Sequence, residues 1–358
     1  MRSTYRKEDV VLLLKDITGL VTPQPAQERE RLIQSGRHYC EMLPVEYVPT
    51  QQYMQVYEEA LRIYALPVAR AVAGLAEKIM RERGPETVLV SLARAGIAAG
   101  ILLKWYLGTY YHADAAHYAV SIIRGRGIDR NAMRYLLARY EPRRLLFVDG
   151  WIGKGAILKE LQKEMAAYPG VSPQLAVLAD PARVTELYGT REDILIPSSC
   201  LNSTVSGLIS RTFLRSDIIG PDDFHGAVYY GQLKGSDLSY AFLNAVGQHF
   251  PKVWAEYEET CKNLAGEKQV LGTGMEEASE IARAFQISDV NLVKPGIGET
   301  TRVLLRRVPW QVLVDARWKD DQALRHIFRL AQEKDVPVVC YPLKHYKCCG
   351  LIQKLPDI

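Results

Sequence analysis

A long amphipathic pattern occupies residues 49–84, where apolar side chains recur at three- and four-residue spacing. The recurring positions are Tyr57, Leu61, Tyr64, Val68, Val72, Leu75 and Ile79. This spacing predicts one long helix, with Thr50 as its cap and Gly84-Pro85 as its end. The next residues, 87–93 (TVLVSLA), form a continuous apolar run of strand length. Such a run is typical of a strand buried on both faces of a parallel sheet.

Helix and strand patterns alternate from this point onward. The expected elements are helix 97–107, strand 117–123, a polar loop, helix 131–140, strand 145–149, helix 154–167 and strand 174–179. Strands that alternate with helices at this spacing are joined by right-handed crossovers. The pattern therefore predicts an α/β domain with a doubly wound parallel sheet.

The pattern loosens after Asp180 and resumes near the end of the chain. Residues 181–274 are expected to be helices and loops attached to the sheet, and 271–275 (LGTGM) resembles a linker. A second α/β pattern follows, with helix 276–285, strand 290–293, helix 299–307, strand 311–314, helix 322–334 and strand 337–341. We therefore expect two domains, residues 1–274 and a smaller one at 275–358.

Composition is that of a soluble globular protein. The 358 residues are 48% hydrophobic and 24% charged, with a net charge of +4. No apolar run approaches the roughly 20 residues that span a bilayer, and the N-terminus lacks a signal peptide, so a cytoplasmic protein is expected. The six cysteines form no CxxC pair, which favours reduced thiols over a metal site.

Candidate phosphate-binding residues follow the expected strands, where open α/β sheets bind their ligands. They are Arg94, Ala95 and Gly96 after the first strand, and Gly150, Gly153, Lys154, Gly155 and Ala156 after the third. Small residues at a helix N-terminus let backbone amides approach a phosphate. Asp149 ends the third strand, where it offers a carboxylate to the same ligand.

The loop 124–130 (RGRGIDR) is basic and rich in glycine, and we expect a mobile lid there. Simpler interpretations stay open: Asp149 could cap a helix, Lys154 could be an ordinary first-turn lysine, and Arg124 and Arg126 could be solvated. A P-loop is excluded because the motif GxxxxGK[ST] is absent, and a dinucleotide fingerprint is also absent.

These motifs resemble the type I phosphoribosyltransferase family, in which two acidic residues and a Thr/Gly-rich turn bind the ribose phosphate of phosphoribosyl pyrophosphate. Asp149 stands at the first acidic position, Gly150 replaces the second, and 153–156 occupies the place of the turn. The resemblance implies a phosphoribosyltransferase-type sheet and a pyrophosphate loop at 93–96. It also implies Asp149, Arg124 and Arg126 as catalytic residues, and Mg²⁺ held indirectly through Asp149.

Four longer stretches, SLARAGI, SIIRGRGID, FVDGWIGKGAI and LNSTVSGLISRTF, are similar to a narrower group over nearly the whole chain. This group is the phosphoribosyltransferase-like proteins of bacterial tellurite-resistance and stress gene clusters, which is also catalogued as the predicted cysteine protease StiP family. A protease needs a thiol beside a base. Cys200, in PSSCLNST, could meet His225 with Asn202 or Asp222 as its orienting group, and Cys40 lies two residues from His38.

Residues 202–213 mix polar and apolar side chains in a way that suits a helix lining the pocket, with Ser206-Gly207 and Arg211 facing it. An amphipathic helix packed on the sheet would explain the same pattern.

The C-terminal domain carries KPGIGETTRVLLRR (294–307), which places a glycine-rich turn, threonines and arginines at a helix N-terminus. The motif resembles the small Pelota RNA-binding domain of the kink-turn-binding superfamily. The glycine–x–Asn–Glu signature is matched at Gly296 and Glu299, whereas Gly298 replaces the asparagine. A second RNA-facing loop is expected at 343–350, where Tyr346 could stack on a base. The expected RNA contacts are Lys294, Gly296, Glu299, Thr300, Arg302, Arg306, Lys344 and Lys347.

Three functions follow from these patterns. The first is pentosyl transfer by a phosphoribosyltransferase-like enzyme that binds phosphoribosyl pyrophosphate or a ribose 5-phosphate nucleotide, together with RNA. The second is a non-catalytic nucleotide and RNA sensor, because one acidic residue of the family motif is missing. The third is a cysteine protease that uses Cys200 or Cys40. No membrane partner is expected, and both a monomer and a homodimer stay open.

Overall fold

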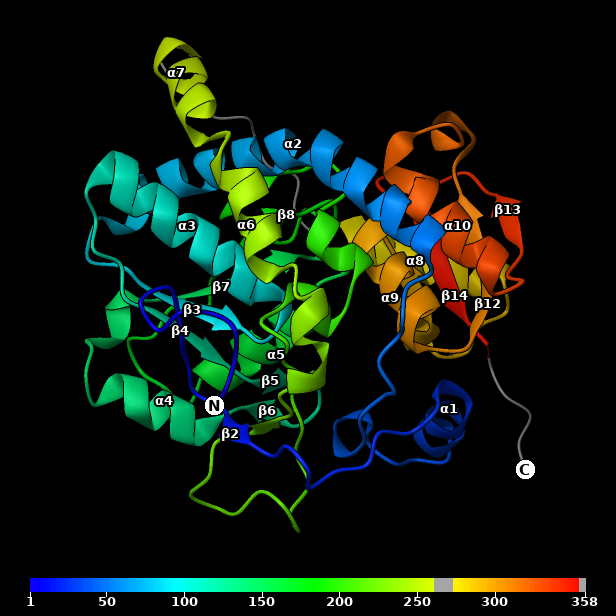
Figure 1. Ribbon diagram of the computed structural model, residues 1–358, viewed down its shortest axis with the longest axis horizontal. Coiled ribbons are helices and arrows are strands. Elements are labelled where there is room, and N and C mark those ends of the chain that lie inside the picture. The colour runs from blue at the N-terminus through cyan, green and yellow to red at the C-terminus, as the bar shows by residue number, and fades with distance from the viewer. Residues whose placement is uncertain (261–272, 354–358) are drawn as a thin grey trace.

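Two α/β domains lie side by side in the computed structural model, which describes residues 1–260 and 273–353 (Figure 1). We call these two ranges the N-terminal and the C-terminal domain. The expected linker, 271–275, lies partly outside the described residues. Its last part, Thr273–Met275, begins helix α8 (Thr273–Ala284).

A six-stranded sheet forms the centre of the N-terminal domain, in the order β1-β4-β3-β7-β8-β9. Its strands are β1 (Val11–Leu12), β3 (Val88–Leu92), β4 (His117–Val120), β7 (Leu145–Trp151), β8 (Leu175–Ala179) and β9 (Tyr188–Thr190). All neighbouring pairs are parallel. The doubly wound α/β fold expected from the sequence is thereby confirmed.

Helices cover both faces of this sheet, as Figure 1 shows. Alternate residues of each strand point to opposite faces, so Leu146 and Val148 pack with one layer, and Leu145 and Phe147 with the other. The first layer contains α2 (Gln51–Arg83), α3 (Ala95–Tyr111), α6 (Ser239–Gly247) and α7 (Phe250–Thr260). The second contains α4 (Arg130–Leu137) and α5 (Ala156–Met165). The core therefore has two halves separated by the sheet.

Helix α2 begins and ends where the sequence predicts. The Thr50 side chain accepts a hydrogen bond from the backbone of Tyr53 at 3.1 Å. Gly84 ends the helix with φ of +75°, a left-handed conformation that favours glycine. Short elements complete this domain: α1 (Ala26–Gln34), the parallel pair β2 (Lys15–Asp16) and β10 (Gly226–Ala227), and the hairpin β5 (Ile122–Ile123) and β6 (Gly127–Ile128).

Residues 202–213 do not form the expected helix. Only a 3-10 turn at Ser203–Val205 is regular, and the rest is held by bridges such as the pairing of Phe213 with Gly226. The polar side chains of this segment form hydrogen bonds with backbone groups. The Ser206 hydroxyl, for example, donates to the Asn202 carbonyl at 2.8 Å. Such local hydrogen bonds compete with a helix.

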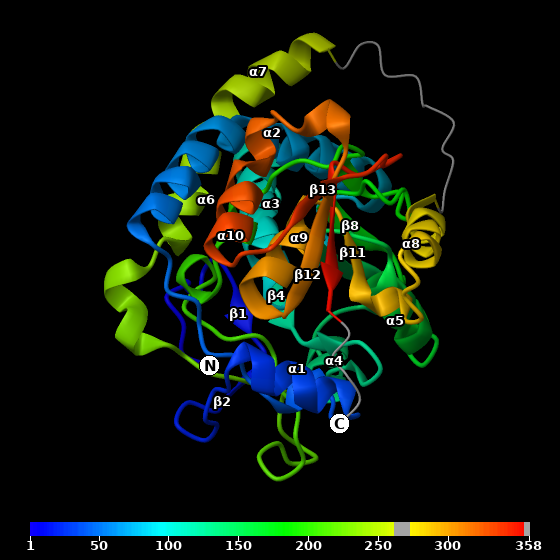
Figure 2. The same cartoon turned by 90° about the vertical axis from the view of Figure 1, so that its right-hand side faces the viewer.

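The C-terminal domain has a four-stranded sheet of order β11-β14-β12-β13. Its strands are β11 (Val293–Pro295), β12 (Pro309–Val314), β13 (Val338–Cys340) and β14 (Cys348–Ile352). Helix α8 covers one face, whereas α9 (Ile297–Arg306) and α10 (Arg325–Glu333) cover the other and face the N-terminal domain (Figure 2). Strand β14 was not expected, because Cys348–Gly350 falls in the loop that the sequence assigned to RNA.

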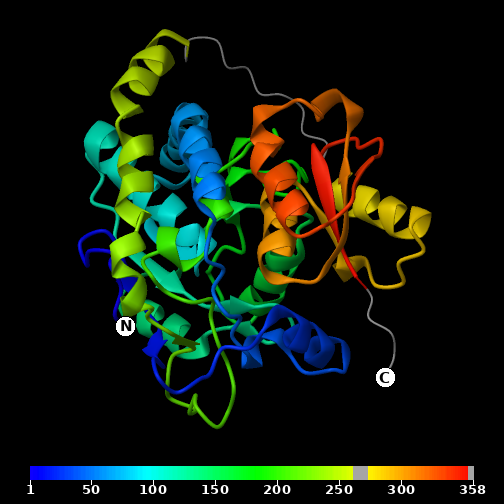
Figure 3. The ribbon, with the colours of Figure 1, turned by 45° about the vertical axis from the view of Figure 1, so that its right-hand side comes forward.

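One hydrophobic cluster runs through both domains. It joins Tyr53 and Val68 of α2 to Leu304 of α9 and Leu330 of α10, all of them buried. Polar contacts also join the two domains. Helix α1 lies beneath the C-terminal domain in Figure 3, and the two carboxylate oxygens of its Glu30 accept hydrogen bonds from the Arg307 guanidinium at 2.6 and 2.8 Å. The two domains therefore share one core.

Among the described residues, no helix is long and apolar enough to cross a membrane.

Candidate functional site

The sheet order creates a crevice at the ends of β3 and β7. These strands are neighbours, but the chain leaves β3 toward β4 and leaves β7 toward β8, which lie on opposite sides. A doubly wound sheet binds ligands at such a switch point, beyond the carboxyl ends of its strands. Here those ends carry the two segments that the sequence singled out, 93–96 and 149–156.

A cavity of about 330 Å³ lies at this point, between the two domains, and its volume is within the range of small-molecule sites. Most of the predicted phosphate-site residues line it, namely Arg94, Ala95, Arg124, Asp149, Gly153, Lys154, Gly155 and Ala156. Gly96, Gly150 and Arg126 are outside its lining. The structure thus brings the two predicted segments to one cavity.

The cavity wall is strongly basic. Seven arginines and two lysines line it against two carboxylates, Asp149 and Glu299. The cations are Arg29, Arg94, Arg124, Lys154, Arg211, Lys294, Arg302, Arg306 and Arg307. Four of these come from the C-terminal domain. An excess of cations in a partly desolvated cavity attracts anions much more strongly than the same charges do on an open surface.

Asp149 is the carboxylate nearest the predicted phosphate turn. Burial raises its pKa to about 6, although the neighbouring Arg302 guanidinium opposes this shift. One of its oxygens accepts a hydrogen bond from the Gly150 amide at 2.7 Å. A carboxylate with this pKa changes its charge close to neutral pH, so it can hold a hydroxyl or a cation in one state and donate a proton in the other.

The turn after β7 is covered by the C-terminal domain. The Lys154 ammonium donates to the carbonyls of Val290 and of Val293, the latter at 2.8 Å, and burial lowers its pKa to about 7. Helix α5 starts after Gly155, which has φ of +87°, and its first amides have no acceptor within the helix. The amides are therefore the free donors of this turn, whereas the lysine links the two domains.

The basic loop 124–130 forms a hairpin rather than an open lid. Arg124 reaches the side chain of Asn291 across the domain boundary at 2.7 Å. Arg126 points away from the cavity and binds Glu41 at 3.0 Å. The Gly125 amide binds a Glu160 oxygen at 2.7 Å. These contacts, with the β5–β6 pairing, fix the loop that the sequence interpreted as mobile.

The face expected to contact RNA is turned toward the N-terminal domain. Lys294, Glu299, Arg302 and Arg306 line the cavity, and Thr300 is fully buried. The reason lies in the glycine-rich turn: a Cβ on Gly298 would stand only 2.3 Å from the Trp151 ring, so this turn packs directly against β7. In this structure the expected RNA cradle at α9 therefore packs against the N-terminal domain, and the RNA contacts of these residues stay a prediction.

The second expected RNA loop is also engaged within the protein. The Tyr346 ring is 1% exposed and its hydroxyl donates to the Gly153 carbonyl at 2.6 Å, so it is not available for stacking on a base. Lys347 pairs with Asp321 at 2.7 Å. Lys344 stays on the surface, paired with Glu280, and Gly296 lies beside the buried Asp193.

Only one of the two predicted thiol–histidine pairs exists. Cys200 is fully buried, and the His225 ring instead contacts the Ser121 hydroxyl at 2.9 Å. Burial raises the pKa of the Cys200 thiol to about 12. Cys200 therefore has neither a base nor access to solvent in this structure.

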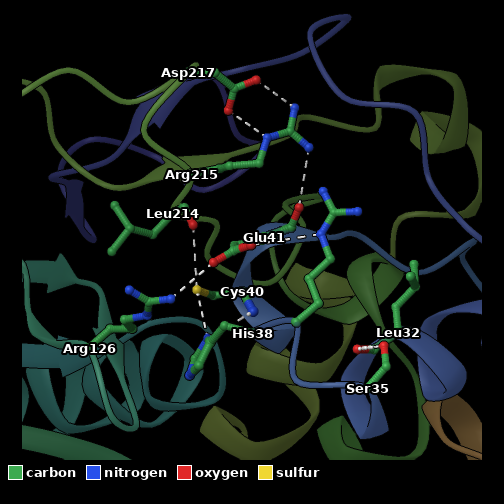
Figure 4. A network of polar contacts seen from close by, with 10 residues as sticks. Leu32, Ser35, His38, Cys40, Glu41, Arg126, Leu214, Arg215 and Asp217 are labelled. Atoms are coloured by element: carbon green, nitrogen blue, oxygen red, sulfur yellow. Dashed lines mark hydrogen bonds and ion pairs between the residues drawn. The ribbon is translucent and has the colours of Figure 1, made fainter.

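Cys40 and His38 face each other, as Figure 4 shows. The Cys40 sulfur lies 2.9 Å from His38 Nδ1, while His38 Nε2 lies 3.0 Å from the Arg124 carbonyl. A carbonyl only accepts, so Nε2 carries the proton, and Nδ1 is the acceptor that both the thiol and, at 3.4 Å, the Cys40 amide face. The sulfur is fully buried, however, and burial raises the pKa of the Cys40 thiol to about 11.

Comparison with known proteins identifies the family. A model described as "Tellurite-like stress resistance cysteine protease StiP" matches residues 3–247, and one described as "PELOTA RNA binding domain" matches residues 272–354. The curated cysteine protease StiP of Acinetobacter baylyi is 36% identical over 378 residues, which cover 98% of this chain and 94% of that protein. This chain belongs to the StiP family. The resemblance drawn from its motifs is confirmed, as is the C-terminal Pelota domain.

Solved phosphoribosyltransferases match this StiP-family chain only in part. The xanthine-guanine-hypoxanthine phosphoribosyltransferase of Helicobacter pylori is 19% identical, with a TM-score of 0.24, over 31% of this chain and 69% of that one. A hypoxanthine-guanine phosphoribosyltransferase of Bacillus anthracis is 16% identical, with a TM-score of 0.26, over 41% and 81%.

Several cavity residues of this StiP-family chain were missed by the sequence analysis. Arg29 lies in AQERERLIQ, a stretch so polar that it reads as an exposed helix, yet Arg29 is fully buried. Arg307 likewise carries no local sign of its place. Arg211 was singled out and does line the cavity. These residues are brought together by contacts such as those of Arg29 and Glu30 in α1 with Arg306 and Arg307, which no local pattern encodes.

Proposed function

We propose that this chain binds a phosphoribosyl ligand, either phosphoribosyl pyrophosphate or a ribose 5-phosphate nucleotide, in the cavity between its domains. The observation that carries the proposal is that nine basic side chains and two carboxylates line the cavity at the β3–β7 switch point, with Arg302 and Arg307 paired to Glu299 and Glu30. Asp149 would hold the ribose hydroxyls, the amides of 153–156 the 5-phosphate, and Arg94 and Arg124 the pyrophosphate. These roles suit the residue types, because amides and guanidiniums are strong phosphate donors.

Magnesium fits this proposal through Asp149. Mg²⁺ often binds by one or two carboxylates together with the phosphates of its substrate, so it needs no dedicated cage of side chains. Among the described residues, no group of three or more His, Cys, Asp or Glu could hold a metal. Magnesium would neutralise charge on the diphosphate. The chain itself would orient the ribose through Asp149 and hold the phosphates away from water.

The reaction class that suits this arrangement is pentosyl transfer, in which a diphosphate leaves the ribose carbon. Such a step is accelerated by positioning and charge neutralisation and needs no covalent nucleophile. The cations around the cavity would stabilise the leaving group. The acceptor base is the part of the reaction for which the cavity provides no specific contact.

Calorimetry with phosphoribosyl pyrophosphate and magnesium tests the binding proposal. Asp149→Asn is expected to weaken binding about tenfold, which corresponds to about 1.4 kcal/mol, a typical value for one hydrogen bond to a charged group. Affinity should rise as pH increases through 6, because the carboxyl of Asp149 loses its proton there. The Asp149→Asn variant should lack this rise. Asp217→Asn, at an exposed residue outside the cavity lining, is the control.

Pyrophosphate release separates an enzyme from a sensor. A transferase releases pyrophosphate with at least one base of a panel of purines and pyrimidines. Binding of phosphoribosyl pyrophosphate that depends on Asp149, without any release of pyrophosphate, would favour the non-catalytic sensor. Absence of binding by the wild-type protein at millimolar ligand would reject the phosphoribosyl proposal itself.

A cysteine protease is the second candidate, because the curated relative is named as one and because His38 and Cys40 are in contact. The Nδ1 atom of His38 could take the thiol proton as the sulfur attacks a peptide carbonyl. Arg124 would orient the imidazole through its carbonyl. Since Cys40 is buried, a substrate would have to displace the segment that carries Leu214, whose carbonyl lies 3.5 Å from the sulfur.

Proteolysis of a denatured protein substrate tests this second candidate. Cys40→Ala should abolish cleavage, and His38→Gln should lower it at least 100-fold, as the loss of a general base typically does. The matched control is Cys200→Ala, which removes an equally buried thiol that has no base. Cleavage that survives Cys40→Ala would exclude this dyad.

A further inference from the structure

We propose that Arg29, Arg94, Arg211 and Arg306 form a second anion subsite, which takes a diphosphate group and which the C-terminal domain completes. The inference rests on the proposed function for the ribose end of the ligand. It goes further by extending the diphosphate site beyond Arg94 and Arg124 to a cluster built from α1, the start of α3, the 202–213 segment and α9.

Two of these arginines converge on one neutral oxygen. The side-chain oxygen of Asn202 accepts from Arg94 at 3.3 Å and from Arg306 at 2.5 Å. Arg94 also donates to the Ile209 carbonyl at 2.6 Å. Two guanidiniums that meet at an amide oxygen are held in place without having their charge neutralised. Glu46 lies close enough to favour the charged form of Arg306, but among the described residues no carboxylate forms a salt bridge with either arginine.

Arg29 has donors that nothing satisfies. The side chain is 0% exposed, lines the cavity, and makes one long contact of 3.4 Å with the Arg306 carbonyl. Its Nε and Nη2 atoms have no hydrogen-bond partner among the described residues. Unpaired buried donors are rare and costly, which makes each of them a sign of a missing acceptor.

Arg211 lies over the Tyr39 ring, 4.5 Å from its centroid, and its guanidinium donates to no residue that the structure describes. Burial, with repulsion from neighbouring guanidiniums, lowers the pKa of Arg211 to about 10 and that of Arg29 to about 9. Both still carry their charge at neutral pH. Within the described chain, no salt bridge joins any of the four arginines to a carboxylate, unlike Arg307 with Glu30.

Charge favours a diphosphate over a single phosphate. Four positive charges face a group of about three negative charges in inorganic pyrophosphate, against at most two in a phosphate monoester. Guanidinium groups match phosphate oxygens in pairs, and several separate oxygens are needed to satisfy four of them. A diphosphate held between α3 and α9 offers those oxygens.

Binding of inorganic pyrophosphate to the full-length chain is the test. Arg306→Met and Arg29→Met are each expected to weaken pyrophosphate binding at least tenfold in calorimetry, while ribose 5-phosphate binding changes less than threefold. The control is Arg325→Met, which removes an exposed interdomain ion pair with Glu59 outside the cavity and should leave both affinities unchanged.

Asn202→Asp provides a second, independent variant. The new carboxylate would lie between Arg94 and Arg306 and would take the place of the proposed diphosphate. Aspartate and asparagine have almost the same shape, so the packing would change little. We expect a rise in Tm on the order of 3 °C or more and the loss of pyrophosphate binding. A residue with a merely structural role would instead lower Tm when its hydrogen bonds are altered.

The outcomes separate this inference from the proposed function. Equal pyrophosphate affinity in wild type and in the Arg29, Arg306 and Asn202 variants would overturn the subsite, even if ribose 5-phosphate binds. A fall in Tm for Asn202→Asp with unchanged pyrophosphate binding would also overturn it. Pyrophosphate binding that depends on the arginines, without any ribose 5-phosphate binding, would support the subsite and reject the phosphoribosyl proposal.

Discussion

A Gly298→Val variant is expected to lose affinity for the proposed phosphoribosyl ligand by on the order of 100-fold, or about 2.7 kcal/mol. A Cβ at this position would stand 2.3 Å from the Trp151 ring, which is held under the Arg302 guanidinium at 4.3 Å. The ring has no free rotation there, so the first turn of α9 must move away from β7. Arg302 and Arg306 then leave the cavity, and its anion contacts are lost.

Calorimetry and thermal unfolding measure this effect. Tm should fall together with affinity, because displacement of α9 also disturbs the shared core around Leu304. Gly235→Val is the matched control, since a Cβ on Gly235 would meet nothing within 4 Å. The double variant with Trp151→Ala should recover part of the lost affinity by removing the obstacle. Failure of Gly298→Val to change either quantity would show that α9 is not held in the described position.

Gly96→Val is expected to destabilise the fold by about 3 to 5 kcal/mol, and most of the protein to accumulate in insoluble form. A Cβ on Gly96 would stand 2.4 Å from the Val148 carbonyl oxygen and 3.2 Å from the carbonyl carbon. Both atoms are backbone, and β7 is held on each side by β3 and β8, so no side-chain rotation relieves the clash. Gly96 thus lets α3 approach β7, which differs from the phosphate contact that the sequence suggested.

Denaturant unfolding of the purified soluble fraction gives the free energy of unfolding for Gly96→Val. Gly96→Ala should show a smaller loss in the same direction, because it adds only the Cβ. Gly235→Val again controls for the loss of a glycine as such. A Gly96→Val protein as stable as the wild type would mean that α3 and β7 lie further apart than described.

The sequence predicted the N-terminal sheet because its central strands are continuous apolar runs. The run 87–93 became β3, and the expected strand 145–149 became β7, longer by two residues. The short edge strands β1 and β9 were missed, since two or three residues with partly exposed side chains carry no clear pattern. Strand β14 was missed because its CCGLI sequence adjoins basic residues that suggested an RNA loop.

The sequence predicted only those residues of the candidate site that lie at the end of a strand. Asp149 and Arg94 were found because the ends of parallel strands meet at one edge of the sheet. Arg302 and Arg306 were identified as functional but given an RNA role, because their position across from β7 depends on how the domains pack. Arg29 could not have been found, as a buried guanidinium in a polar helix leaves no trace in the local pattern.

The hydrophobic cluster shared by α2, α9 and α10 determines whether the two domains can move apart when a ligand binds or leaves. Moving the domains apart would expose Leu304 and Leu330 on one side and Tyr53 and Val68 on the other, all of them buried now. At roughly 1.5–3 kcal/mol per large apolar side chain, such a motion approaches the cost of unfolding a small protein. The two domains are therefore expected to keep their relative placement while a ligand binds or leaves.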